Sequence, residues 1–122
     1  MVHMLQLSHK NLDVYKISMK LVEEIYRKTE DFPAVERYVL TNQLRRAAIS
    51  VCSNIAEGCA RKSKLEKVRF FEISRSSLVE IDTQIEISFI LEYLQQNKIK
   101  ELENYLERSF MMLSKMIETT GA

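Results

Sequence analysis

Glycine and proline are scarce in this sequence, with two glycines and one proline among 122 residues. These residues mark turns and interrupt helices, and no run of β-branched residues is set off by turn residues. Long helices with short connections are therefore favoured over strands. Apolar runs are short as well, since none approaches the length of about 18 residues that a membrane span needs. The sequence predicts an all-α protein without a membrane span.

The N-terminus lacks the pattern of a signal peptide, because MVHMLQLSHK has no basic segment followed by a long apolar core. We therefore expect a cytoplasmic protein. A chain of 122 residues is long enough to bury one core without metal or disulfide support. Residues 1–122 are expected to form a single domain, in which residues 1–10 are a loose lead-in.

Groups that carry catalysis are few. The two histidines, His3 and His9, lie in the lead-in, and the two cysteines are Cys52 and Cys59. The sequence contains no nucleophile–base pattern, no Glu-x-x-His pair and no glycine-rich phosphate loop. The cysteines are about 10 Å apart along a helix, too far for a disulfide, so buried apolar positions are favoured over redox or metal roles. We expect no enzymatic activity, no cofactor and no metal.

Apolar spacing predicts a first helix over residues 11–30, with Asn11 as its N-cap. Its main core stripe has spacings of three and four and comprises Leu12, Tyr15, Met19, Val22 and Tyr26. A smaller second stripe comprises Val14, Ile17 and Leu21. Asp31-Phe32-Pro33 then breaks the helix, and Phe32 is expected to close one end of the core.

The second helix is expected over residues 34–57, with Gly58 closing it in the left-handed conformation. Ser63 and Glu66 match a capping box, so a third helix is expected from there to about residue 95. One of its apolar stripes comprises Phe71, Leu78, Ile81, Ile85 and Phe89. The fourth is expected over residues 98–119, and its inward residues are Ile99, Leu102, Leu106, Phe110, Leu113 and Ile117. Short connections make neighbouring helices antiparallel, which predicts an antiparallel up-down-up-down four-helix bundle.

The second helix has three differently specialised sides, which are a core side, a polar stripe and a further apolar side. Its core side comprises Leu40, Leu44, Ala47, Ala48, Val51 and Ile55. Opposite lies a polar stripe, which comprises Gln43, Arg46, Ser50, Asn54 and Glu57. This polar stripe is either a solvated face with local ion pairs, or a contact surface that lines a groove or central opening of an oligomer.

Further apolar residues widen the apolar arcs of the second and third helices beyond what a monomeric bundle can bury. The expected oligomer-interface residues are Ile49, Cys52, Ala56, Ile73, Ile87 and Leu91. Leu94 continues the arc on the third helix. We therefore expect the chain to form a homo-oligomer.

Charge is balanced overall but unevenly placed. Residues 45–75 hold eight basic and three acidic residues, a net charge of +5, whereas residues 76–122 hold four basic and eight acidic ones, a net charge of −4. The candidate nucleic-acid-binding residues are Arg45, Arg46, Arg61, Lys62, Lys64, Lys67 and Arg69. They form either a phosphate-contact patch or an ordinary solvated helix start.

The order of several motifs resembles a known family. These are Leu12 to Tyr15, Phe32-Pro33 with Glu36 and Tyr38, Gln43-Leu-Arg-Arg-Ala-Ala48, Asn54-Ile-Ala-Glu-Gly58, Glu66 with Arg69-Phe-Phe71, and Thr83-Gln84. Together they resemble the bacterial four-helix-bundle proteins encoded in intervening sequences of the large-subunit ribosomal RNA gene. One departure is Ser76, where that family often has a glycine before a Ser-Leu pair, which argues against a very close helix approach there.

The resemblance implies a left-handed up-down-up-down bundle that assembles into a ring-like homopentamer without established enzymatic activity. A related branch, the accessory variability determinant of diversity-generating retroelements, is a basic pentamer that works with a reverse transcriptase and nucleic acid. That role is not expected here, because the net charge is only +1. The expected function is weak, sequence-tolerant binding of RNA or DNA by an oligomer, and the alternative is a protein-interaction scaffold.

Overall fold

The computed structural model describes residues 4–122, which consist of helices and connecting segments. Four long helices dominate: α1 (Asp13–Thr29), α2 (Leu40–Ala60), α3 (Lys64–Ile90) and α4 (Lys100–Gly121). Three short 3-10 helices precede α1, α2 and α4: η1 (Ser8–Asn11), η2 (Ala34–Glu36) and η3 (Gln96–Lys98). The predicted all-α fold class is confirmed. Within residues 4–122 no helix is both long and apolar enough to cross a membrane.

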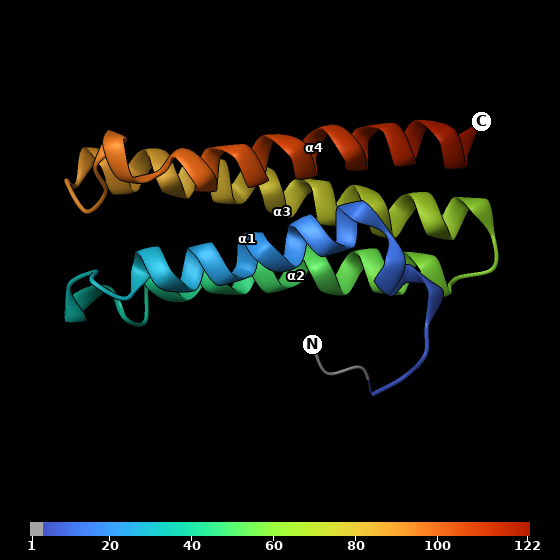
Figure 1. Cartoon of the computed structure of the whole chain (residues 1–122), viewed down its shortest axis with the longest axis horizontal. Helices are drawn as coiled ribbons and strands as arrows, with labels where there is room; N and C mark the ends of the chain where they lie inside the picture. The colour runs from blue at the N-terminus through green and yellow to red at the C-terminus, as the bar shows by residue number, and fades with distance from the viewer. Residues whose placement is uncertain (1–3) are drawn as a thin grey trace.

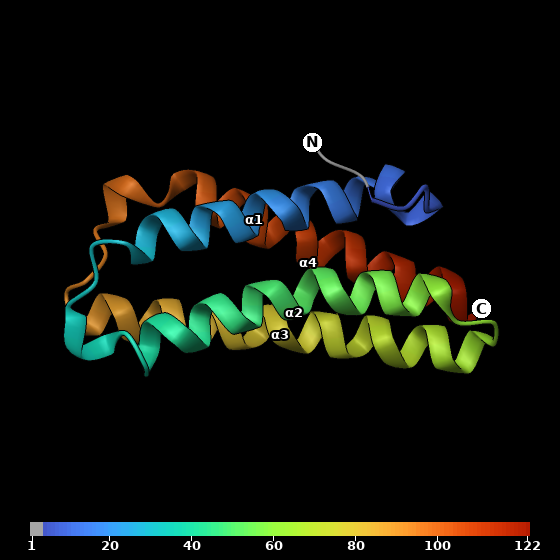
Figure 2. The ribbon, with the colours of Figure 1, turned by 90° about the horizontal axis from the view of Figure 1, so that it is seen from below.

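The helices lie side by side along the long axis, and the chain reverses direction at each connection (Figure 1). Each helix packs against two neighbours, α1 against α2 and α4, and α3 against α2 and α4. The contact between α2 and α3 is the most extensive. The view from below shows these two helices running alongside each other over their whole length (Figure 2). The handedness of the bundle stays a prediction.

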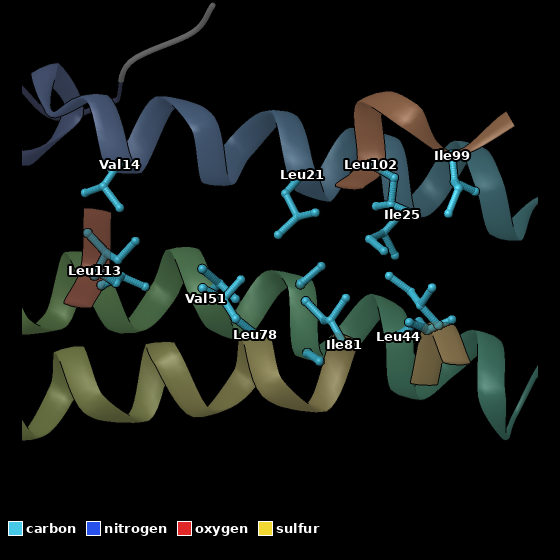
Figure 3. Packing of buried hydrophobic residues seen from close by; sticks show 14 of the residues in the cluster. Val14, Leu21, Ile25, Leu44, Val51, Leu78, Ile81, Ile99, Leu102 and Leu113 are labelled. Carbon is cyan, nitrogen blue, oxygen red and sulfur yellow. The ribbon is translucent and has the colours of Figure 1, made fainter. Parts of the chain in front are cut away.

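One hydrophobic core lies between the four helices. Leu21 and Ile25 of α1, Leu44 and Val51 of α2, Leu78 and Ile81 of α3, and Leu102 and Leu113 of α4 point toward one another (Figure 3). The predicted core sides of α2 and α3 are confirmed, since Leu40, Leu44, Ala47, Ala48, Val51 and Ile55 are all buried and so are Phe71, Leu78, Ile81 and Ile85. Phe32 closes one end of this core, as predicted, and its ring packs 5.2 Å from that of Tyr93.

The two apolar stripes of α1 contribute to the core in the opposite order to that predicted, because the stripe expected to be the smaller one is the more buried. Val14, Ile17 and Leu21 are buried and continue to Ile25, whereas Leu12 and Tyr26 are exposed. Aliphatic residues fill the narrow interior, and the tyrosines take the edge of the core, where the hydroxyl reaches water. Asn11 is not the N-cap either, because α1 begins at Asp13 after Leu12, without a capping side chain.

The lead-in is not loose throughout. Residues 1–3, including His3, lie outside the described residues, but Ser8–Asn11 form η1 and His9 is buried. The His9 ring meets the Tyr15 ring edge to face, with centroids 4.8 Å apart. An aromatic contact therefore holds η1 on α1.

Gly58 does not close α2 in the left-handed conformation, because α2 continues to Ala60 and no glycine of residues 4–122 has a positive φ. Gly58 instead lies under the ring of Phe71, where a built Cβ would come within 2.5 Å of Phe71 Cε1. The end of α2 is capped by Lys67, whose Nζ donates to the carbonyl oxygens of Cys59, at 3.1 Å, and Gly58. Glycine is needed here for close helix packing, and lysine satisfies the free carbonyls.

Ser63 begins α3 as predicted, since its Oγ accepts a hydrogen bond from the backbone N–H of Glu66 at 3.1 Å. The helix ends at Ile90, five residues earlier than predicted, because Glu92 takes a left-handed conformation with φ of 63°. The N–H groups of Glu92 and Tyr93 then donate to the carbonyls of Phe89 and Ser88. This is the Schellman pattern, formed here without the usual glycine.

Candidate nucleic-acid interface

The structure divides the candidate nucleic-acid-binding residues into two groups. Arg61, Lys62 and Lys64 lie at or beside the α2–α3 turn, with Lys67 and Arg69 in the first turns of α3. Arg45 and Arg46 lie near the other end of α2, about 24 Å away along the helix axis. The turn residues share their end of the bundle with the C-terminus (Figure 1). Only these five can contribute to one compact interface, which we call the basic end.

Three of the five basic-end residues are held by contacts within the chain. Arg61 pairs with Glu57 at 3.0 Å and stacks over the ring of Phe70. Lys64 donates from Nζ to the carbonyl oxygen of Ala122 at 3.0 Å, and Lys67 caps α2. Lys62 and Arg69 are exposed and have no ion pair within residues 4–122. These two side chains are therefore the ones most available to a phosphate.

Arg45 is a structural residue of the α1–α2 contact. Its Nε donates to Thr29 Oγ1 at 2.9 Å, and its guanidinium lies 4.5 Å from the centre of the Tyr26 ring. Arg46 is exposed on the other side of α2, where it lines a shallow groove between α2 and α3. The structure thus brings neither arginine to the basic end.

The polar stripe of α2 lies along α3 and is only partly a solvated face. Ser77 Oγ donates to Ser50 Oγ at 2.9 Å, and Gln84 Nε2 donates to Gln43 Oε1 at 3.2 Å. Asn54 donates to Ser50, and Glu57 forms a local ion pair with Arg61. Gln43, Arg46 and Ser50 line a groove of about 300 Å³ together with Ser77 and Glu80 of α3. We call these contacts the α2–α3 seam.

The α3 half of this seam was not predicted from the sequence. Ser74, Ser77, Gln84 and Ser88 are buried polar residues, and Ser74 donates to the carbonyl oxygen of Val51 at 2.7 Å. Their spacings of three, seven and four residues were the available signal, because they place small or hydrogen-bonding side chains along one side of α3. Ser76 is exposed and takes no part in this approach.

Four of the six expected oligomer-interface residues form an exposed apolar flank of α2 and α3. Ile49 and Ile73 are 45% and 42% exposed, and Ile87 and Leu91 are similarly open. Ala56 is half-buried, and Leu94 packs against the core instead. Cys52 was assigned to the wrong surface, because it is only 8% exposed within its own subunit. Burial raises the pKa of its thiol to about 12, as expected for a small core residue.

Titratable side chains do not gather into a reactive site in the described part of the chain. Within residues 4–122 no group of three or more His, Cys, Asp or Glu residues could hold a metal ion. Hydrogen bonding to Glu36 raises the pKa of Tyr93, and burial raises those of Tyr15 and Cys59. A groove of about 660 Å³ lies between α1 and α4 and mixes lysines with glutamates along its walls.

Stability should fall as the pH drops below about 6.5, because burial, with a smaller effect of Lys10, lowers the pKa of His9 from its usual 6.5. The unfolded chain then binds a proton more readily than the folded one, so the stabilisation is present above pH 6.5 and is lost as pH falls through the folded pKa. Thermal unfolding between pH 7.5 and 5 measures this. In a His3→Gln background, the added substitution His9→Phe should reduce the dependence of stability on pH in this range. An unchanged dependence would show that His9 is not the group responsible.

Comparison with known proteins decides the family. The family model of the 23S rRNA-intervening sequence protein matches residues 10–115. The chain belongs to this family. None of the curated proteins matches it. This member of the family is similar to the crystal structure of a protein of unknown function from the S23 ribosomal protein family of Bacteroides thetaiotaomicron, with a TM-score of 0.78 and 18% identity over 86% of this chain and 95% of that one. At that identity the likeness shows the shared fold alone.

Proposed function

We propose that this chain is a non-enzymatic cytoplasmic homo-oligomer, a pentamer, that binds RNA weakly and without sequence preference through its basic end. The observation that carries the proposal is the exposure of Lys62 and Arg69, which have no ion pair within residues 4–122. Lysine and arginine placed in this way neutralise phosphates and release counterions. The family name refers to an intervening sequence of 23S rRNA, which is a genomic association, so RNA is the first ligand to test, with DNA beside it.

Oligomerisation strengthens this function. A single basic end offers two free cations, which is a weak phosphate site. Five copies around a ring would present ten, and the affinity contributed by phosphate contacts grows with their number. The exposure of Ile49, Ile73 and Ile87 supports assembly, because covering large apolar side chains with another protomer removes their apolar area from water.

Titration of a labelled structured RNA by the pure protein tests the proposal, with single-stranded and duplex DNA measured beside it. Binding should be detectable by fluorescence anisotropy at about 50 mM salt and weaken by orders of magnitude toward about 200 mM. Lys62→Glu combined with Arg69→Glu should weaken binding at least about tenfold, because each protomer loses two phosphate contacts and gains two repulsions. Neither side chain makes a contact that the fold needs.

The matched control is Arg37→Glu combined with Lys98→Glu, which makes the same change in net charge at the opposite end of the bundle. This variant should retain most of the affinity, and both variants should keep the oligomer mass of the parent. Equal losses in the two variants would show a general charge effect without an interface. If no RNA or DNA binds even at low salt, the nucleic-acid function is wrong and the exposed apolar flank makes a protein scaffold the better account.

A further inference from the structure

A groove runs between α3 and α4, away from the basic end and from the exposed apolar flank. Its two continuous parts, of about 270 and 400 Å³, share Asp82, Leu106 and Glu107. Asp82 lies about 140° around α3 from Ile87, so the groove opens on a different side from the proposed oligomer interface. Phe110, which the sequence analysis wrongly placed in the core, is 42% exposed in this groove.

The apolar surface of the groove is accessible. Val79 is 52% exposed and Met111 is 69% exposed at the open end, and Leu106 lines both parts. Phe89 extends this surface toward the other end, where the buried Ile99 forms part of the floor of the groove. From Ile99 to Met111 the groove follows α4 for about 18 Å, the length of a helix of about 12 residues.

The rim of the groove is acidic on both sides. Asp82 and Glu86 line it from α3, and Glu103 and Glu107 line it from α4. None of these carboxylates makes an ion pair within residues 4–122, and the residues that line the groove include no lysine, arginine or histidine. Arg75 lies next to the groove, with its guanidinium 5.9 Å from the centre of the Phe110 ring, and it donates to Ser114. Four carboxylates thus face an open apolar channel without a cationic partner, which leaves a place for positive charges supplied from outside.

The geometry points to a docking site for a basic amphipathic helix of a partner protein. The apolar stripe of that helix, at spacings of three and four residues, fills the channel over Leu106, Phe110 and Met111. Lysines or arginines on both flanks of the helix reach the carboxylates of α3 on one side and α4 on the other. An apolar stripe in a groove supplies affinity, and the two charged rims fix the orientation and exclude acidic partners.

Other occupants fit the groove less well. RNA and anionic lipid are repelled by four carboxylates. A second copy of this chain offers the two free cations of its basic end, Lys62 and Arg69, at a turn and in the first turns of α3, not along both flanks of an exposed apolar helix stripe. The partner helix must therefore bring its own positive charges.

A fluorescein-labelled amphipathic peptide of leucine and lysine, about 15 residues long, provides the probe for anisotropy titration of the full chain. It should bind, whereas the same peptide with glutamate in place of lysine should not. Glu103→Lys combined with Glu107→Lys should weaken binding at least about tenfold, since two attractions become repulsions. Val79→Asn combined with Met111→Gln should weaken it without changing the net charge.

The matched control is Glu72→Lys combined with Glu118→Lys, which changes the net charge equally at exposed positions outside the groove. This variant should bind the lysine peptide as the parent does. Equal losses in the groove and control variants would overturn the proposal, and so would a failure of the lysine peptide to bind. A change of oligomer mass in Glu103→Lys/Glu107→Lys, measured by light scattering, would overturn it too, because the occupant would then be a second copy.

Discussion

Replacing Gly58 by alanine should destabilise the protein by about 2 kcal/mol, although alanine is the better helix former. Within α2 the exchange gains about 1 kcal/mol of helix propensity. Against this, the added Cβ would lie 2.5 Å from Cε1 and 2.7 Å from Cδ1 of Phe71, far inside van der Waals contact. The Phe71 ring is buried in the core, so a shift of the ring disturbs its neighbours and the overpacking cost falls at the upper end of its usual range of about 1–3 kcal/mol.

Urea unfolding measures this loss of stability. Two further variants test whether contact with Phe71 is its cause. Gly121→Ala is the control, because its Cβ would meet Val68 Cγ2 at an ordinary 3.6 Å and its effect should be close to zero. In a Phe71→Leu background, Gly58→Ala should cost much less than in the parent, since the smaller side chain leaves room for the methyl group. Equal stability of Gly58→Ala and the parent would contradict the close packing of α2 on α3.

Glutamate at both Ile49 and Ile73 should convert the oligomer into a monomer, a fivefold fall in mass if the oligomer is a pentamer. Both side chains are exposed in the subunit, so the bundle itself tolerates the change. In an assembly that covers this flank, each protomer would have to bury two unpaired carboxylates. The unfavourable free energy of desolvating these charges far exceeds the favourable free energy of the apolar contact. Light scattering at micromolar concentration gives the mass, and circular dichroism checks that the helices remain.

The matched control for this dissociation is Val35→Glu combined with Met111→Glu. Both residues are exposed apolar side chains, in η2 and α4, away from the proposed interface. Their exchange should leave the mass unchanged. A parent protein that scatters as a monomer at the same concentration would show that the exposed apolar flank of α2 and α3 has no copy of the chain as its partner.

The fold could be predicted where a pattern has one physical explanation. The core sides of α2 and α3 were found because aliphatic residues recur there at helical spacing, and Ser63 was found because a capping box needs no tertiary information. Gly58 was misjudged because a glycine near a helix end suits either a left-handed cap or a close helix contact, and only the position of Phe71 decides between them. The stripes of α1 were ranked wrongly because tyrosine was counted as a core residue.

The positive charge of the candidate site could be predicted from the sequence, but which of its basic side chains are free to bind a phosphate could not. The net charge of residues 45–75 located the basic end. Which cations are free depends on contacts between residues distant in sequence, such as Lys64 with Ala122, 58 residues away. Arg45 was included in the site for the same reason, since Thr29 becomes its neighbour only when α1 packs on α2. The acidic groove could not be predicted from the sequence because its two rims come from different helices, α3 and α4.

The α2–α3 seam also determines which alignment of the two helices is allowed. Its two side-chain pairs, Ser50 with Ser77 and Gln43 with Gln84, are seven residues apart on both helices. Sliding α2 along α3 by one heptad would keep apolar residues in contact with apolar ones, but it would set Ser50 against Phe70 and Gln43 against Ser77. A purely apolar interface would tolerate that shift, whereas here the shift breaks the hydrogen bonds of both polar pairs and is therefore unfavourable. The α2–α3 seam thus fixes the register of the two helices and keeps the bundle in a single alignment.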